Sequence, residues 1–199
     1  LSFPVRLFPE HIARLPAYPL LNPRRNPIVE EDRAYYERLP LFPVPLQGHA
    51  LQATRVFMNA LSPGEGINTI DLGRLVHAGN IVFPATASTQ GDTYEAYSRR
   101  TNENALLSVF DREMEGGEVR YRAKESAAWL AVGALASYSP KFDALIRRIR
   151  TAEGCVFLYT RFVSGGAIPL CLALEANGYS PYGRKRSLLM DGIQAEGGR

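Results

Sequence analysis

Two groups of basic residues are candidates for contact with phosphate. Three arginines lie between positions 147 and 150 of a predicted helix, and Arg184-Lys185-Arg186 follows a predicted turn. The net charge of +3 and the isoelectric point of about 9.0 permit binding to a polyanion without requiring it. Clustering of basic side chains therefore indicates phosphate contact, and the alternative is that both groups are ordinary solvated faces.

The cysteines and histidines do not predict a metal site. Cys155 and Cys171 each lie in an apolar stretch, with neither a Cys-x-x-Cys spacing nor a neighbouring histidine. We expect both to be reduced, buried thiols rather than a disulfide or a metal pair. His11, His49 and His77 are scattered singly, so no metal is expected.

The first two thirds of the sequence predict a connector followed by helices. Nine of the 14 prolines fall within residues 1–46, which indicates an extended segment with one short helix at Glu31–Arg38. The polar stretch Gly91–Arg100 is predicted to be a loop. Apolar periodicity and glycine or proline stops predict four further helices, at Gln47–Leu61, Asp71–Ala78, Glu103–Glu115 and Ser126–Ala136.

The last third contains the clearest helix signal. Ser139 can cap a helix, and Pro140 suits the first helical position because its missing N–H group is not needed there. Asp143 and Arg147 are spaced to form an ion pair on the face opposite the apolar one. That apolar face consists of Phe142, Leu145, Ile146 and Ile149.

A strand and a second helix are predicted next. Cys155–Tyr159 is a continuous apolar run, as in parallel strands that are buried on both faces. Ala167–Ala176 is predicted to be a helix that is closed by Asn177-Gly178. A helix, a strand and a helix with short links predict an α/β fold with a parallel sheet.

Composition bounds the class of protein. The 199 residues, 46% of them hydrophobic, suit one globular domain or parts of two. No apolar run approaches the ~20 residues that cross a bilayer, and no secretory signal is visible, so we expect a soluble intracellular protein without membrane contact. The chain starts at Leu1 and stops at Arg199 without a closing element, so we expect it to be a fragment.

The order of these elements resembles a known family. Tyr138–Phe142 and its helix, Val156–Val163, and a helix ending at Gly178-Tyr179 are similar to the opening of the second RecA-like domain of superfamily 2 helicases, closest to the Swi/Snf-type branch. Gly79–Pro84 and Tyr179–Arg184 resemble the helicases of nucleocytoplasmic large DNA viruses.

The resemblance implies a domain plan and a function. Residues 1–46 would be a proline-rich interdomain connector, 47–136 a helical insert, and 137–199 the incomplete start of the C-terminal RecA-like domain. The chain would be part of a nucleic-acid-dependent ATPase or helicase in viral transcription or replication, located in the virion or in the host cytoplasm or nucleus. Its expected partners are DNA or RNA and the remainder of the helicase polypeptide.

The resemblance also implies site residues. The loop after the first strand would face nucleic acid, and a glycine-rich helix start offers backbone N–H groups to phosphate. The alternative is that the two glycines only permit a tight turn. Ser139 and Lys141 would orient the helix that they begin. The nucleic-acid-binding candidates are Thr160, Arg161, Ser164, Gly165, Gly166, Arg184, Lys185 and Arg186.

ATP chemistry is not expected from this chain alone. Such a motor binds ATP and Mg²⁺ through a Gly-x-x-x-x-Gly-Lys-Ser/Thr loop and an acidic pair, and no such loop occurs here. Residues 62–66 form a lysine-free predicted turn, and residues 29–32 read as a solvated loop. No catalytic residue or cofactor is therefore assigned to the chain, and the enzyme would be the parent protein.

Two other functions remain open at this stage. One is a non-catalytic nucleic-acid or protein-binding module derived from a helicase. The other is an unrelated small-molecule α/β enzyme, although no catalytic residues stand at the predicted strand end.

Overall fold

The elements of this protein are seen in a computed structural model that describes residues 44–61 and 69–190. The chain divides into two units, Leu1–Val44 and Pro45–Arg199, and the helices and strands described belong to the second unit. The predicted connector up to residue 43, its short helix Glu31–Arg38 and the turn at residues 62–66 lie outside the described residues.

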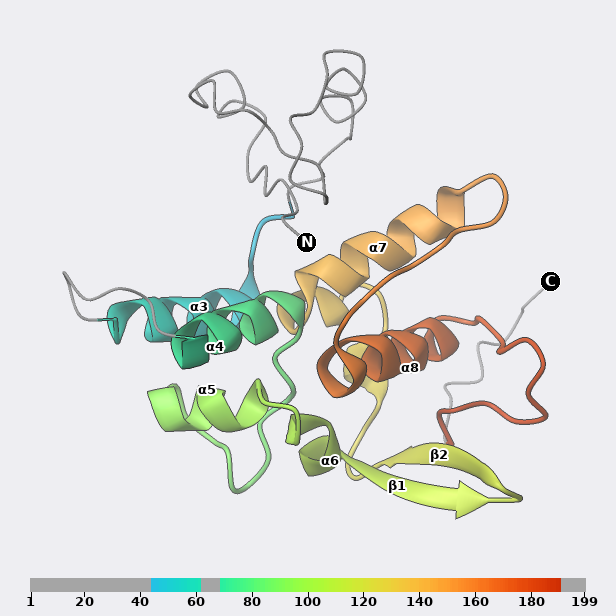
Figure 1. Ribbon diagram of the computed structural model, residues 1–199, viewed down its shortest axis with the longest axis horizontal. Helices are drawn as coiled ribbons and strands as arrows, with labels where there is room; N and C mark the ends of the chain where they lie inside the picture. The colour runs from blue at the N-terminus through green and yellow to red at the C-terminus, as the bar shows by residue number, and fades with distance from the viewer. Residues whose placement is uncertain (1–43, 62–68, 191–199) are drawn as a thin grey trace, which may run out of the picture. The chain divides into compact units, whose positions relative to one another are not determined.

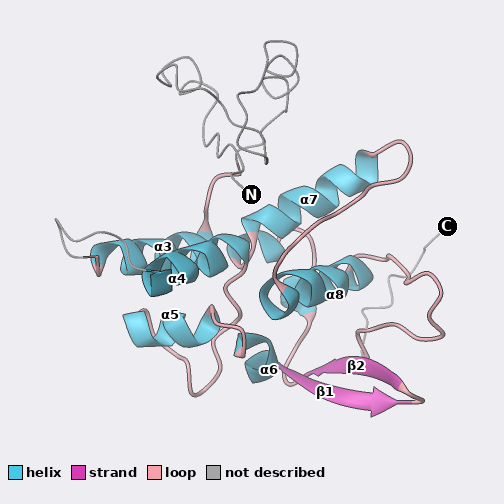
Figure 2. Cartoon of the chain, in the orientation of Figure 1, coloured by secondary structure: helices cyan, strands magenta, loops and turns pink. Residues whose placement is uncertain are grey.

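The described chain is mainly helical, with one small sheet (Figures 1 and 2). Short 3₁₀ turns lie at Ala128–Leu130 and Leu135–Ser137, and a π-helical turn, Val163–Ala167, leads into the last helix. The regular elements are α3 (Gly48–Asn59), α4 (Thr69–Asn80), α5 (Tyr94–Arg100), α6 (Ala105–Val109), β1 (Phe110–Glu115), β2 (Glu118–Ala123), α7 (Pro140–Thr151) and α8 (Ile168–Ala176).

Four predicted helices are confirmed as α3, α4, α7 and α8. Helix α7 begins as expected, because the Ser139 hydroxyl accepts a hydrogen bond from the Phe142 N–H at 3.2 Å and Pro140 follows the cap. The Asp143–Arg147 ion pair also forms, at 2.7 Å. Its carboxylate is not on an exposed face, however. Asp143 is buried and also accepts from the Gly133 N–H at 2.7 Å.

Three predictions for the middle of the chain are wrong. The predicted loop Gly91–Arg100 contains α5, whose start is capped by Thr93. The predicted helix Glu103–Glu115 ends early, and the chain continues into β1. Gly116 and Gly117 have φ of 61° and 82°, and they form the turn of a β1–β2 hairpin instead of a helix end. The predicted helix Ser126–Ala136 is replaced by one 3₁₀ turn, Ala128–Leu130, and the start of a second, Leu135–Ser137.

The sheet in the described residues is antiparallel. Strands β1 and β2 pair from Phe110–Ala123 to Glu115–Glu118. The fold is therefore broadly α/β, with mixed helix and a small sheet. One isolated parallel bridge joins Tyr121 of β2 to Leu189.

The predicted strand Cys155–Tyr159 does not form in the described part of the chain. Its residues are extended and exposed, and Figure 2 draws them as a loop between α7 and α8. Apolar content alone does not make a strand, because a strand needs a neighbour to accept and donate its backbone hydrogen bonds. No such neighbour lies among the described residues.

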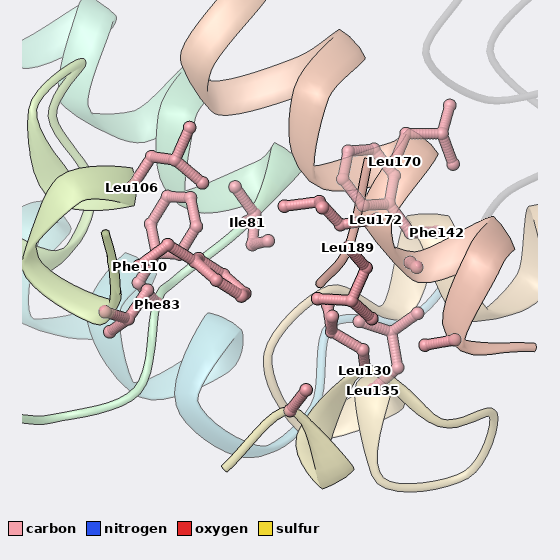
Figure 3. Packing of buried hydrophobic residues seen from close by; sticks show 14 of the residues in the cluster. Ile81, Phe83, Leu106, Phe110, Leu130, Leu135, Phe142, Leu170, Leu172 and Leu189 are labelled. Atoms are coloured by element: carbon pink, nitrogen blue, oxygen red, sulfur yellow. The ribbon is translucent and has the colours of Figure 1, made fainter. Parts of the chain in front are cut away.

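The larger core cluster lies between α6, the hairpin, α7 and α8 (Figure 3). In this view Phe83, Leu106 and Phe110 lie together on one side of the cluster, and Leu130 and Leu135 lie together on another. Residues on both sides of position 136 thus share one apolar core. A smaller cluster joins α3, α4 and α5 and contains Ala50, Ala53, Phe57, Ala78, Val82 and Tyr97.

A short extended segment links the two clusters. Ile81 and Phe83 belong to the larger cluster, and Val82 between them belongs to the smaller one. Neighbouring side chains of an extended chain point to opposite sides, so this segment contributes to both. The Val82 N–H donates to Tyr138 O at 2.9 Å, and the Phe83 N–H donates to Arg100 O at 3.0 Å.

The end of α8 is bonded to the segment beside the hairpin. The Glu175 carboxylate accepts from the N–H groups of Leu188 and Leu189, at 2.8 and 2.7 Å. The Tyr121 N–H of β2 in turn donates to Leu188 O at 2.7 Å. Helix α8 and the hairpin are therefore held together through this segment.

None of the described helices has both the length and the apolar character that a bilayer span requires.

Candidate nucleic-acid interface

The predicted phosphate-binding loop folds into a helix start. Val163–Ala167 forms a π-helical turn that continues into α8. The Ala167 N–H donates to Phe162 O at 2.9 Å, so helical hydrogen bonding begins there. The first turn of any helix leaves N–H groups without a carbonyl one turn back, and these N–H groups can bind an anion.

Close packing explains why two glycines occur at this turn. A Cβ on Gly165 would lie 3.0 Å from His77 Nδ1, and one on Gly166 would lie 2.6 Å from Thr160 Oγ1. Neither glycine has a positive φ, so space rather than backbone conformation requires them. These contacts support the alternative in which Gly165 and Gly166 only permit a tight turn between the segment and the helix.

Three of the predicted residues line one hollow. Arg161, Ser164 and Gly165 share a pocket of about 260 Å³ with His77 and Glu103, and Phe162 and Val163 complete its wall. We call this pocket the Arg161 hollow. It brings a guanidinium, a hydroxyl and a helix start to one place.

The Arg161 guanidinium is available to a ligand. Arg161 is exposed, and its guanidinium carbon lies 5.4 Å from the centroid of the Phe162 ring. Among the described residues it has no hydrogen-bond or ion-pair partner. The Phe162 ring in turn packs on His77, with the ring centroids 4.8 Å apart.

Sequence reasoning missed His77 and Glu103. His77 lies in the last turn of α4 with no local motif around it, and Glu103 follows α5 in an exposed turn. Burial lowers the pKa of His77, an effect that the charge of Glu103 opposes. The neutral form of the imidazole is therefore favoured more than in a free histidine.

Two partly buried histidines predict a pH-dependent stability. Burial lowers the pKa of both His49 and His77 from the ordinary value of 6.5. Below that value the unfolded chain binds more protons than the folded one, so the free energy of unfolding falls as the pH falls. Urea midpoints should drop between about pH 7.5 and 5.5, and less steeply in His77→Gln. An equal drop in His77→Gln would show that His77 does not contribute.

The second basic group is placed elsewhere. Arg184 Nη2 donates to Val119 O of β2 at 2.8 Å, and Arg186 pairs with Glu115 of β1. Lys185 between them is exposed. None of the three lines the Arg161 hollow. The two arginines are occupied by the hairpin, so they are weak candidates for phosphate contact.

Two other predicted residues have structural contacts. Thr160 Oγ1 accepts from the Phe162 N–H at 3.3 Å, which shapes the turn. The Lys141 ammonium donates to Asn80 Oδ1 at 2.8 Å, and the Ser139 hydroxyl donates to Asn80 O. Much of the Lys141 side chain is exposed to solvent, but burial around its ammonium group lowers the pKa of Lys141. Both side chains fasten the start of α7 to the end of α4.

The arginines of α7 also have partners within the protein. Arg147 pairs with Asp143, and Arg150 Nη2 donates to Asn177 Oδ1 at 3.2 Å. These contacts support the interpretation of a structural, solvated face for the first basic group.

The prediction of buried thiols is wrong. Cys155 and Cys171 are both free and both exposed. Cys155 lies in the unpaired extended segment, and Cys171 lies on the outer side of α8. In the described ranges, no three histidine, cysteine or acidic side chains come together to hold a metal ion.

Comparison with known proteins identifies no relative. No family model matches the chain, and neither a curated protein nor a solved structure is similar to it.

Proposed function

We propose that this chain contributes part of the second motor domain, and its nucleic-acid-facing surface, to a superfamily 2 ATPase or helicase acting in viral transcription or replication. The family part of the proposal rests on the resemblance described above. The observation that carries the nucleic-acid part is the Arg161 hollow, where an unpaired guanidinium meets a helix start.

The chemistry of this hollow suits a phosphate group. A guanidinium and backbone N–H groups both donate hydrogen bonds to phosphate oxygens, and such contacts do not depend on base sequence. His77 adds a polar side chain to the wall, and burial favours the neutral form of its imidazole. Glu103 is the one carboxylate among the lining residues, and it works against anion binding.

We also propose that Cys155–Thr160 is the first strand of a parallel sheet completed by the remainder of the helicase polypeptide. The support is the unusual exposure of apolar side chains here: Phe157 is 91% exposed and Tyr159 80%. An extended apolar segment between two helices, with open backbone groups, is suited to pairing with strands on its edges.

ATP and Mg²⁺ do not fit the residues of this chain. The sequence contains no phosphate-binding loop with its lysine, and the glycine-rich stretch at residues 62–66 lacks that residue. Both would bind to the parent protein, so no step of ATP hydrolysis is assigned to the residues described here.

Titration of labelled single-stranded oligonucleotides at several salt concentrations tests the interface. Arg161→Ala should weaken binding of every sequence about equally, by roughly tenfold at low salt. It should also make the slope of log K against log salt shallower by about 0.7, the share of one phosphate contact on a single strand. Fluorescence anisotropy measures both quantities.

The matched control is Arg55→Ala, which removes the same charge from an exposed position on α3, away from the Arg161 hollow. It should leave the affinity and the salt slope nearly unchanged. If Arg161→Ala binds like the wild type at every salt concentration, or if the wild type does not bind at low salt, the interface is misassigned.

A further inference from the structure

A second hollow adjoins the first. It has a volume of about 400 Å³ and lies between α4 and α5, and we call it the α4–α5 hollow. His77 and Glu103 line both hollows. The two hollows therefore lie next to each other and share this pair of residues.

The α4–α5 hollow carries its own basic side chains. Arg99 is exposed, and the hydrogen bond found for it in the described residues joins Nη1 to Ser88 O at 3.3 Å. Most of its guanidinium thus remains open to a ligand. Arg74 is held more tightly, since it donates to Asp71 at 3.2 Å and to the Tyr94 hydroxyl. Arg99 is therefore the stronger candidate for phosphate contact.

We propose that the two hollows form one continuous groove and that a single strand of nucleic acid runs along it, from the Arg161 hollow past His77 and Glu103 to Arg99. This inference rests on the proposed function, and it adds α4 and α5 to the nucleic-acid path. The Arg161 hollow, at about 260 Å³, is smaller than the ~300–1,000 Å³ of small-ligand pockets, and the α4–α5 hollow, at about 400 Å³, is near the lower end of that range. That size suits successive nucleotides of a single strand better than a duplex.

Glu103 makes the path testable in two directions. Glu103 lines both hollows, so a phosphate chain that runs through both passes this residue. Removing the charge should relieve repulsion and strengthen binding, whereas removing Arg99 should weaken it. A change of general stability would not shift affinity upward in one variant and downward in the other.

The experiment uses the full 199-residue chain and a fluorescein-labelled oligothymidylate of about 20 nucleotides, longer than the ~4–16 that one small binding domain covers. Arg99→Ala should weaken binding about fivefold and make the salt slope shallower by about 0.7. Glu103→Gln should strengthen binding about threefold, because the interaction between two exposed charges changes the affinity by about that factor. Arg55→Ala serves again as the control, because Arg55 lines neither hollow.

The outcomes separate the two proposals. If Arg161→Ala weakens binding while Arg99→Ala and Glu103→Gln behave like the wild type, the groove is not the path and the proposed function stands. If Arg161→Ala has no effect, the proposed interface fails and the continuous path fails with it. Circular dichroism and the thermal midpoint of each variant establish that it is folded.

Discussion

The isolated chain is expected to self-associate through Cys155–Thr160 at micromolar concentration, and Phe157→Asp is expected to leave it monomeric. Phe157 and Tyr159 are the two most exposed large apolar residues of this segment. Burying an aromatic side chain of this kind contributes about 1.5–3 kcal/mol. The backbone groups of the segment can pair with a second copy at the same time, as unprotected strand edges do.

Sedimentation velocity over a range of concentrations measures this association. It should be done in the presence of a reductant, because Cys155 lies in the same exposed segment and could form an intermolecular disulfide. Met58→Asp is the control, since Met58 is an exposed apolar residue on α3. A wild-type chain that stays monomeric, or a Met58→Asp variant that dissociates as fully as Phe157→Asp, would contradict the prediction.

Replacing Gly48 by alanine is expected to destabilise the fold by about 2–4 kcal/mol, from overpacking together with an unfavourable backbone conformation. Gly48 begins α3 with φ of 52°, a left-handed value that costs most residues free energy. An added Cβ would also lie 2.1 Å from Ser137 Oγ and 2.7 Å from Ser137 Cα, so backbone would have to move.

Two other glycines separate these causes in urea denaturation. Gly133 has φ of 98° but open space around it, so Gly133→Ala should cost only about 1–2 kcal/mol. Gly79 lies in α4 with neither constraint, so Gly79→Ala should be neutral or stabilise by up to about 1 kcal/mol. If all three variants unfold at the same urea concentration, the contact with Ser137 does not decide the cost at Gly48.

The parts of the fold that sequence predicts well are those with local signals. Helix α7 has a serine cap, a proline at its first position and a one-sided apolar face, and all three act within the helix itself. Helix α5 has seven residues, which is too short for a periodic apolar face. Its Thr93 cap alone does not predict a helix, because threonine is also common in turns. The hairpin was missed because a Gly-Gly pair can either end a helix or turn between two strands. Only the pairing of β1 with β2 decides between these.

The site was predictable only in part for the same reason. Arg161, Ser164 and Gly165 are near neighbours in sequence, and the structure places them in one hollow. His77 and Glu103 reach that hollow from distant segments, without any motif of their own. Arg184 and Arg186 look like a free basic group in sequence, but their partners are on the hairpin. Long-range pairing of this kind leaves no trace in local spacing.

The helix that begins at the Arg161 hollow has a structural consequence. The turn at Val163–Ala167 and α8 form one continuous rod of about 20 Å, at ~1.5 Å per residue. At its far end, the Glu175 carboxylate accepts hydrogen bonds from the N–H groups of Leu188 and Leu189 beside the hairpin. The helix is also packed along its length, since Leu170, Leu172, Ala173 and Ala176 are buried in the larger core cluster. One packed element therefore connects the Arg161 hollow with the β1–β2 hairpin.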